Sequence, residues 1–279
     1  MAYGKTIELF LVNGTADSLV TAELSNWNGK AIKIPRTEVS GCGREDIRGI
    51  GVYFLLCQGD DGLDSVYIGE AEVIQDRLKQ HIADYQSGKE KYYWNTAVAF
   101  IGRDLNKALI RYLENRLVEI ARECGQYVVL TKNTYKNTVL KESQVASMEE
   151  FIEHVEVLMS ALGYKVLVSV PKATNDTTYF YCKGADADAK GFISSGGFTV
   201  VKGSKFSSYT VPSMEVHCKS QFRLRNAMEQ EGVIVDGELI RDYEFASPST
   251  ASTVILGRSS NGMVDWKTRE GIKLKDITI

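Results

Sequence analysis

Two short tyrosine motifs stand close together in the sequence. They are Gly51-Val52-Tyr53 and Tyr67-Ile68-Gly69; Arg77 comes ten residues after the second tyrosine, and Glu114 comes 37 residues after Arg77. A tyrosine hydroxyl, with a pKa of about 10, becomes a base only where a guanidinium or a metal-bound water favours its phenolate. A guanidinium offers a fixed fork of donors to oxyanions, and a single carboxylate offers a hard oxygen ligand to Mg²⁺. These residue types suit the activation of water beside an anionic group.

The elements that must bring these residues together form a small α/β unit over about residues 50–131. Two apolar runs are expected to pair as an antiparallel hairpin, joined by a turn at Gly59-Asp60-Asp61-Gly62. Apolar residues at helical spacing predict two helices, of which the first contains Arg77 and the second contains Glu114. In chain order we expect strands Gly51–Cys57 and Ser65–Ile68, helix Val73–Tyr85, strand Thr96–Ile101, helix Asn106–Glu123 and strand Tyr127–Leu130.

The paired triplets, with Arg77 and Glu114 in the helices that follow, resemble the GIY-YIG nuclease family; valine replaces the isoleucine of the first triplet. The resemblance covers residues 49–131. It implies a Mg²⁺-dependent (or Mn²⁺-dependent) endonuclease that hydrolyses DNA phosphodiester bonds. In this interpretation Tyr53 and Tyr67 activate a water between them. Arg77 stabilises charge on the phosphate, and Glu114 holds the metal ion.

The same resemblance assigns secondary members of the site. His81, in the first predicted helix, falls where relatives carry a His or Tyr that hydrogen-bonds the catalytic tyrosine. Gly51 and Gly69 are expected to border the substrate. Relatives carry an asparagine about a dozen residues after the metal-binding glutamate, where this chain has Gln126. We therefore assign the substrate-assisting amide to Asn133.

Two acids depart from the family pattern. Members often carry a basic residue just after the second triplet, but Glu70 and Glu72 stand there in this chain. Carboxylates beside a phosphate-binding face weaken affinity for DNA or bind additional metal. They keep open an alternative function, in which the chain retains the fold as a catalytically inactive nucleic-acid-binding, protein-interaction or regulatory protein.

Each site residue also has a purely structural interpretation. Tyr53 and Tyr67 are of a residue type common in strands. Arg77 would pair with an acid on its own helix or just before it. Glu114 would pair with a neighbouring arginine, and His81 would be an exposed helix residue. For each residue taken alone, the structural interpretation is favoured. Because all five residues together match the pattern of one family, we favour the interpretation as a catalytic site.

A second module begins near residue 178. Four segments resemble a module of unknown biochemical function that often follows GIY-YIG nuclease domains: Lys190–Phe192, Gly197–Ser204, Phe245–Ala251 and Gly257–Gly262. Residues 166–230 carry eight basic and five acidic residues, which suits a phosphate-facing surface. We therefore expect this domain to select the substrate. Its candidate substrate-binding residues are Lys202, Lys205, Arg223, Arg225 and Arg258.

Length and composition bound the class of protein. The chain has 279 residues, 44 % hydrophobic and 25 % charged, which suggests two globular domains. Its five cysteines form no Cys-x-x-Cys pair and its three histidines are dispersed, which disfavours a disulfide framework or a zinc site. Without a signal peptide or an apolar run of the ~18 residues that span a membrane, we expect a cytoplasmic protein.

These observations predict an α+β fold whose partner is nucleic acid, DNA before RNA, and not a membrane. A β extension (1–48) would precede the nuclease domain (49–140), followed by a helical connector (141–170) and an α+β domain (171–279). One metal per site predicts one nick per site, so cutting both strands requires a homodimer or two visits. By analogy alone, restriction or phage defence is the biological role that fits.

Overall fold

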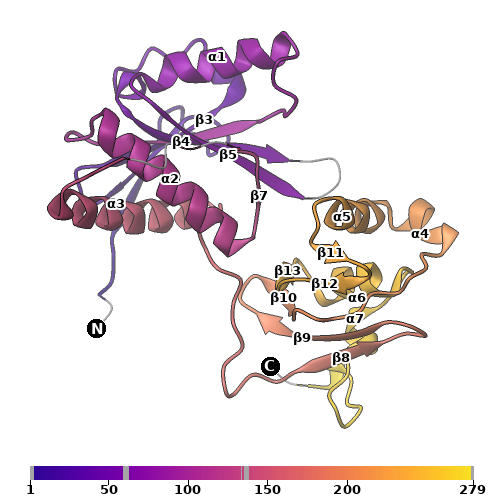
Figure 1. The fold of residues 1–279 in the computed structure, drawn as a ribbon. Coiled ribbons are helices and arrows are strands. Elements are labelled where there is room, and N and C mark those ends of the chain that lie inside the picture. The colour runs from indigo at the N-terminus through magenta and orange to yellow at the C-terminus, as the bar shows by residue number, and fades with distance from the viewer. Residues whose placement is uncertain (1–2, 59–62, 133, 135–137, 278–279) are drawn as a thin grey trace. The chain divides into compact units, whose positions relative to one another are not determined.

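The computed structural model describes residues 3–58, 63–132, 134 and 138–277, and the chain forms two compact units. The first contains Met1–Gln58 and Asp64–Val168, and Ser169–Ile279 build the second. Both units combine strands with helices, so the predicted α+β class is confirmed (Figure 1). The turn predicted at 59–62 lies outside the described residues.

A seven-stranded mixed sheet is the framework of the first unit, with strand order β1-β2-β3-β6-β4-β5-β7. Neighbouring strands are antiparallel except β5 and β7, which run parallel. The predicted hairpin is therefore present as β4 and β5. The strands are β1 (Ile7–Leu11), β2 (Val20–Leu24), β3 (Lys30–Pro35), β4 (Gly51–Gln58), β5 (Asp64–Ala71), β6 (Thr96–Ile101) and β7 (Val128–Val129).

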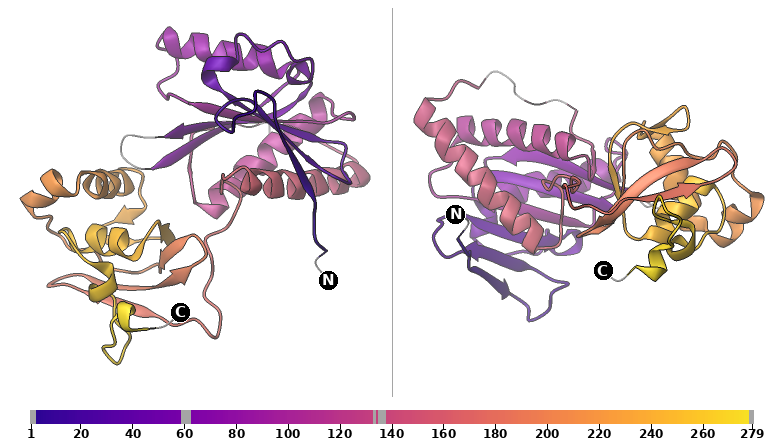
Figure 2. Two further views of the ribbon diagram at one scale, coloured as in Figure 1. Left: turned by 180° about the vertical axis from the view of Figure 1, so that it is seen from behind. Right: turned by 90° about the horizontal axis from the view of Figure 1, so that it is seen from below.

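Helices cover both faces of this sheet. Helix α1 (Ile74–Gln86) packs on one face, and α2 (Lys107–Cys124) and α3 (Glu142–Ala161) pack on the other (Figures 1 and 2). Successive side chains of a strand point to opposite faces. Tyr53 of β4 therefore joins the core beneath α1, whereas Phe54 joins the core beneath α2 and α3. Two 3₁₀ turns, Arg36–Glu38 and Asp46–Arg48, complete the unit.

Two elements of the first unit differ from the sequence-based expectation. The acidic, amphipathic pattern within the predicted connector favours a helix from Ser147. Helix α3 instead begins at Glu142, because the Gln144 side chain accepts a hydrogen bond from the Lys141 backbone N–H and extends the N-terminus. Strand β2 was not predicted; it is held by pairing with β1 and β3, which its own five residues do not reveal.

The second unit is built on a four-stranded antiparallel sheet of order β13-β10-β9-β8. Phe198 packs 4.4 Å from the Trp266 ring, between centroids, and both side chains are fully buried. The strands are β8 (Phe180–Lys183), β9 (Asp188–Ser194), β10 (Gly197–Val200) and β13 (Tyr243–Phe245), with a separate hairpin of β11 (Ile234–Val235) and β12 (Glu238–Leu239).

The helices of the second unit are short. The pair Asn261-Gly262 is typical of a turn, but Asn261 caps α7, because its side chain accepts a hydrogen bond from the Met263 N–H. No helix among the described residues combines the length and the apolar character that crossing a bilayer requires. The helices are α4 (Pro212–His217), α5 (Lys219–Gln230), α6 (Pro248–Leu256) and α7 (Gly262–Asp265), followed by a 3₁₀ turn at Leu274–Asp276.

Candidate active site

A cleft of about 560 Å³ in the first unit brings the predicted catalytic residues together. Tyr53 and Tyr67 line it from the hairpin, Arg77 from α1 and Glu114 from α2. Helices on opposite faces of the sheet can both contribute side chains to this cleft, because β5 is next to the edge strand β7. Within the part of the chain that is described, β7 pairs with β5 only near its start, at Ser65 and Val66.

The register of the hairpin positions both tyrosines. Tyr53 lies opposite Gly69 and Leu55 lies opposite Tyr67, and the two tyrosine rings stack with centroids 6.2 Å apart. A Cβ added at Gly69 would lie 2.6 Å from Cζ of Tyr53 and 2.9 Å from Cε1 of Tyr67. A Cβ at Gly51 would overlap the carbonyl oxygen of Phe100. The two motif glycines thus make room for the tyrosines and the sheet; both are buried.

Arg77 reaches the tyrosine hydroxyls from the first turn of α1. Its Nε donates to the Tyr53 hydroxyl at 3.3 Å, and its guanidinium also interacts with the Tyr67 hydroxyl. Its Nη1 donates to Gln80 at 2.7 Å. Of the two acids that the structural interpretation offers Arg77, Asp84 lies 3.7 Å from Lys89 and Glu70 lies 2.9 Å from Lys107.

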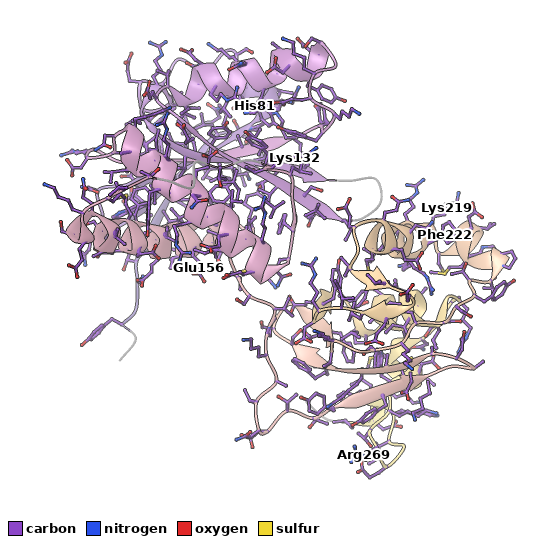
Figure 3. The ribbon with its side chains drawn as sticks, in the orientation of Figure 1. His81, Lys132, Glu156, Lys219, Phe222 and Arg269 are labelled. Atoms are coloured by element: carbon purple, nitrogen blue, oxygen red, sulfur yellow. The ribbon has the colours of Figure 1, made fainter. Side chains whose placement is uncertain are left out.

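His81 lies one helical turn beyond Arg77 and is fully buried, so the expectation of an exposed residue is wrong (Figure 3). Its Nε2 is 2.8 Å from the Tyr53 hydroxyl, and its Nδ1 is 2.6 Å from a Glu90 carboxylate oxygen. Burial, together with the positive charges of Arg77 and Arg36, lowers the pKa of His81 to about 3. A neutral imidazole beside a carboxylate carries its proton on Nδ1, which leaves Nε2 to accept the Tyr53 proton.

Glu90 and Tyr92 belong to this network but were not predicted from the sequence. The Tyr92 hydroxyl hydrogen-bonds Glu90, and its ring stacks on Tyr67 with centroids 5.7 Å apart and planes 15° apart. Burial raises the pKa of both groups above their ordinary values. Both lie in a segment without helix or strand, so no periodic pattern could have linked them to His81.

Burial also raises the pKa of the two tyrosine hydroxyls. It raises the pKa of Tyr53 well above its ordinary value, and the neighbouring Tyr67 adds to the effect while Arg77 opposes it. The pKa of Tyr67 is raised by burial as well, again against the influence of Arg77. Both hydroxyls are therefore protonated at neutral pH. Either one must pass its proton to a neighbour before it can act as a base.

Glu114 is a buried carboxylate, 6 % exposed, whose Oε2 has no hydrogen-bond partner among the described residues. Burial, and then the nearby Glu70, raises its pKa to about 7. A cleft-lining glutamate that has a buried carboxylate oxygen without a partner fits a Mg²⁺ ion, which binds through one or two carboxylates, waters and phosphate oxygens. No cluster of three or more His, Cys, Asp or Glu ligands occurs in the described ranges.

Lys107 neutralises part of the unexpected acidity at the cleft. Its ammonium lies 2.9 Å from Glu70 and 3.8 Å from Glu72, and all three residues line the cleft. Lys107 and Glu114 are two helical turns apart and therefore on one face of α2. The positive charge lowers the pKa of Glu114, in opposition to Glu70. The sequence did not indicate this role, because Lys107 is distant from both acids along the chain.

The remaining predicted substrate-binding residues are Asn133 and five residues of the second unit. Asn133 lies outside the described residues. In the second unit, Lys202, Lys205, Arg223 and Arg258 are exposed. Arg225 needs correction as a substrate-binding residue, because its guanidinium is buried and is held inside the domain. It donates to the carbonyl oxygens of Val254 (2.9 Å) and Ser207 (2.5 Å), and its Nε donates to Glu229 (3.2 Å).

A larger hollow of about 680 Å³ lies elsewhere in the first unit, bordered by Trp27, Gly102 and the start of α3. Trp27 packs edge-on against Phe151 (4.9 Å) and tilts against His154 (5.0 Å). None of the five predicted catalytic residues lines this hollow. The tyrosine cleft, rather than the larger hollow, is therefore the candidate active site.

Comparison with protein families identifies a known domain in the C-terminal part of the chain. Residues 180–278 match a domain of unknown function, DUF4357. This agrees with the expected C-terminal module, and the matched residues lie in the second unit. Searches of curated proteins and of solved structures each returned no match. The chain is thus a two-unit α+β protein whose second unit carries the DUF4357 domain.

Proposed function

We propose that the first unit is a Mg²⁺-dependent endonuclease of the GIY-YIG type that hydrolyses DNA phosphodiester bonds. One observation carries the proposal: Tyr53, Tyr67, Arg77 and Glu114 line one cleft, and Glu114 has a buried carboxylate oxygen without a partner among the described residues. These residues come from four elements, β4, β5, α1 and α2. A merely structural use of the motifs would not require all of them to converge on one solvent-accessible space.

Tyr53 is the stronger candidate for the group that accepts a proton from water. Its own proton has a receiver, because Nε2 of His81 lies 2.8 Å from the hydroxyl oxygen. In the proposed step the Tyr53 oxygen takes a proton from water while its own proton moves to Nε2. Glu90, 2.6 Å from Nδ1, then stabilises the imidazolium that forms. The water oxygen attacks phosphorus, and the bond to the leaving oxygen breaks.

Arg77 and a metal ion held by Glu114 stabilise the negative charge on the phosphate. The planar guanidinium of Arg77 donates to non-bridging oxygens as negative charge grows on them. Glu114 holds Mg²⁺ or Mn²⁺, which when bound supplies a Lewis acid for the phosphate and the departing oxygen. Because the pKa of Glu114 is about 7 without metal, the carboxylate must lose its proton to serve as a ligand.

The alternative is a protein that binds nucleic acid without cutting it, and the acidic residues Glu70 and Glu72 favour it. The contacts of Lys107 weaken this argument, since its positive charge lies 2.9 Å from Glu70 and 3.8 Å from Glu72 and offsets part of their negative charge. The same positive charge reduces the electrostatic repulsion that a phosphate beside Glu114 would meet. We therefore place cleavage first and binding alone second.

A cleavage panel tests the proposal. Labelled single-stranded, duplex and branched DNA are incubated with the full-length protein and Mg²⁺, Mn²⁺ or EDTA. We expect metal-dependent nicks, reduced at least about 100-fold by Arg77→Ala or Glu114→Gln, the range seen when one transition-state contact is removed. Lys79→Ala on α1 and Glu123→Gln on α2, both exposed, are matched controls. Equal product from all five proteins would refute the assignment.

A further inference from the structure

A hollow of about 500 Å³ on the second unit is not used by the proposed nuclease reaction. Tyr181 lines it together with three cations, Lys183, Lys267 and Arg269. Arg269 lies in the loop that follows α7 (Figure 3), and its guanidinium is 5.9 Å from the Tyr181 ring centroid. The hollow therefore combines an aromatic ring with a concentration of positive charge.

Backbone pairing extends this charge into a row across the sheet. Tyr181 pairs with Lys190 on one side and with Lys267 on the other, and Lys267 pairs in turn with Lys273. Directly opposed residues of antiparallel strands project from the same face, so these four residues form one line, the Tyr181 row. Three inter-strand spacings of about 4.8 Å make the row about 14 Å long.

Two acids, Asp188 and Asp265, also line the hollow. Asp188 lies 3.6 Å from Lys183, and the Asp265 carboxylate accepts a hydrogen bond from Ser260 at 2.6 Å. Among the residues that are described, neither the three lysines of the Tyr181 row nor Arg269 forms an ion pair. Four cations thus remain available to an anionic ligand on this face.

The aromatic part of the face suits unpaired bases. The Tyr181 ring is partly exposed, and a second ring lies beside the row, where the Lys190 ammonium is 3.6 Å from the Tyr179 centroid. Sequence-tolerant single-strand binding uses such aromatic rings for stacking and cations for the backbone. Bases of a duplex are stacked on one another and cannot reach an isolated ring.

We propose that the Tyr181 row, with Arg269, binds a single strand of nucleic acid. A base stacks on Tyr181, and phosphates lie against Lys267 and Arg269 and along the other lysines of the row. The row extends over more than one nucleotide, so the ligand is a strand rather than a mononucleotide. The proposal supplements the nuclease function and requires only the surface of the second unit, so it stands or falls independently of cleavage.

Fluorescence anisotropy of a labelled 20-nucleotide oligothymidine tests it, in EDTA and over a range of salt concentrations. The full-length Arg77→Ala protein is the background, so that cleavage cannot consume the probe. Lys267→Ala with Arg269→Ala should weaken binding at least tenfold and lower the salt slope by about 1.4, the loss of two phosphate contacts. Lys172→Ala with Lys219→Ala removes the same charge from other exposed positions of the second unit and should change affinity less than twofold.

Tyr181 is tested separately. Tyr181→Ala should weaken binding about tenfold and Tyr181→Phe less than twofold, because stacking needs the ring and not the hydroxyl. Equal losses in the two charge variants, or tight binding by all proteins, would overturn the proposal. So would competition by unlabelled duplex or by thymidine monophosphate as effective as that by single-stranded DNA. Thermal melts show whether each variant is folded.

Discussion

The Tyr53 hydroxyl lies 2.8 Å from Nε2 of His81, and the other nitrogen of that imidazole lies 2.6 Å from Glu90. A buried hydroxyl, a neutral imidazole and a carboxylate are thus connected in one line. The arrangement resembles a catalytic triad, in which a carboxylate orients a histidine that takes the proton of a nucleophilic hydroxyl. The Tyr53 hydroxyl occupies the position of that nucleophile. Here the line ends at a water-accessible cleft, which suits removal of a proton from water.

The first prediction concerns Glu90 as a positioning residue. Glu90→Gln keeps an oxygen near Nδ1 but removes the charge that stabilises an imidazolium, so we expect kcat to fall about tenfold or more with KM little changed. Nitrogen NMR of His81 should show the proton on Nδ1 in the wild type. A proton on Nε2 instead, or an unchanged kcat in Glu90→Gln, would contradict the proposed proton path.

The second prediction concerns Gly69. Gly69→Ala places a methyl group against the Tyr53 and Tyr67 rings, and Tyr53 is fully buried and cannot move aside. Overpacking of this kind costs about 1–3 kcal/mol of unfolding free energy, and we expect cleavage to fall with it. Urea unfolding measures the loss. Gly41→Ala, where no atom lies within 4 Å of an added Cβ, is the control and should be nearly neutral.

The third prediction concerns Lys107. Its ammonium offsets Glu70 and lowers the pKa of Glu114, so Lys107→Ala should raise that pKa further. The rising limb of the pH–rate profile would then move to higher pH. Adding Glu70→Gln to Lys107→Ala removes the opposing charge as well and should return the limb toward its original position. A double-mutant cycle with no coupling between the two residues would show that the ion pair does not tune the site.

The fourth prediction is a pH dependence of stability that arises from Glu114 in the absence of metal. Its pKa is about 7 in the folded protein and 4.5 ordinarily, so between these values the unfolded chain releases the proton first. This residue therefore destabilises the fold progressively as pH rises from about 4.5 to 7, by up to about 3 kcal/mol.

Urea unfolding in EDTA at pH 4.5 and pH 8 checks this, with Glu114→Gln for comparison. The difference in stability between variant and wild type should grow in favour of the variant by about 3 kcal/mol at the higher pH. Other titrating groups cancel in that difference. Adding Mg²⁺ at pH 8 should then stabilise the wild type more than Glu114→Gln. A pH-independent difference would show that the carboxylate is not destabilised by burial.

Much of the first unit follows from local patterns. The alternation along Gly51–Gln58 places Tyr53 and Phe54 on opposite faces, as strand geometry requires. Helical spacing puts the buried Leu113 and Leu117 of α2 toward the core, with Glu114 beside them. Arg77 and His81 lie one turn apart on α1 and so on one side of it. Their positions were predictable because each depends on neighbours a few residues away.

The features that the sequence could not predict depend on contacts between residues far apart in the chain or outside regular elements. Glu90 has no regular element around it, and Lys107 meets Glu70 across 37 residues of chain. Arg225 was assigned to a substrate surface from its charge, but burial and two backbone carbonyls hold it inside the domain. Lys267 meets Tyr181 only because a distant segment returns beside β8.

The amino-acid order by itself determined most elements around the cleft, which side of each is apolar, and where the tyrosine, arginine and glutamate side chains stand along them. Only the tertiary structure decided which of them meet and in what state of protonation: a neutral His81 between Tyr53 and Glu90, and a Glu114 with its pKa near neutrality. The reason is that dielectric surroundings and charge separations are set by residues far away in the chain, brought near only when the sheet and its helices pack.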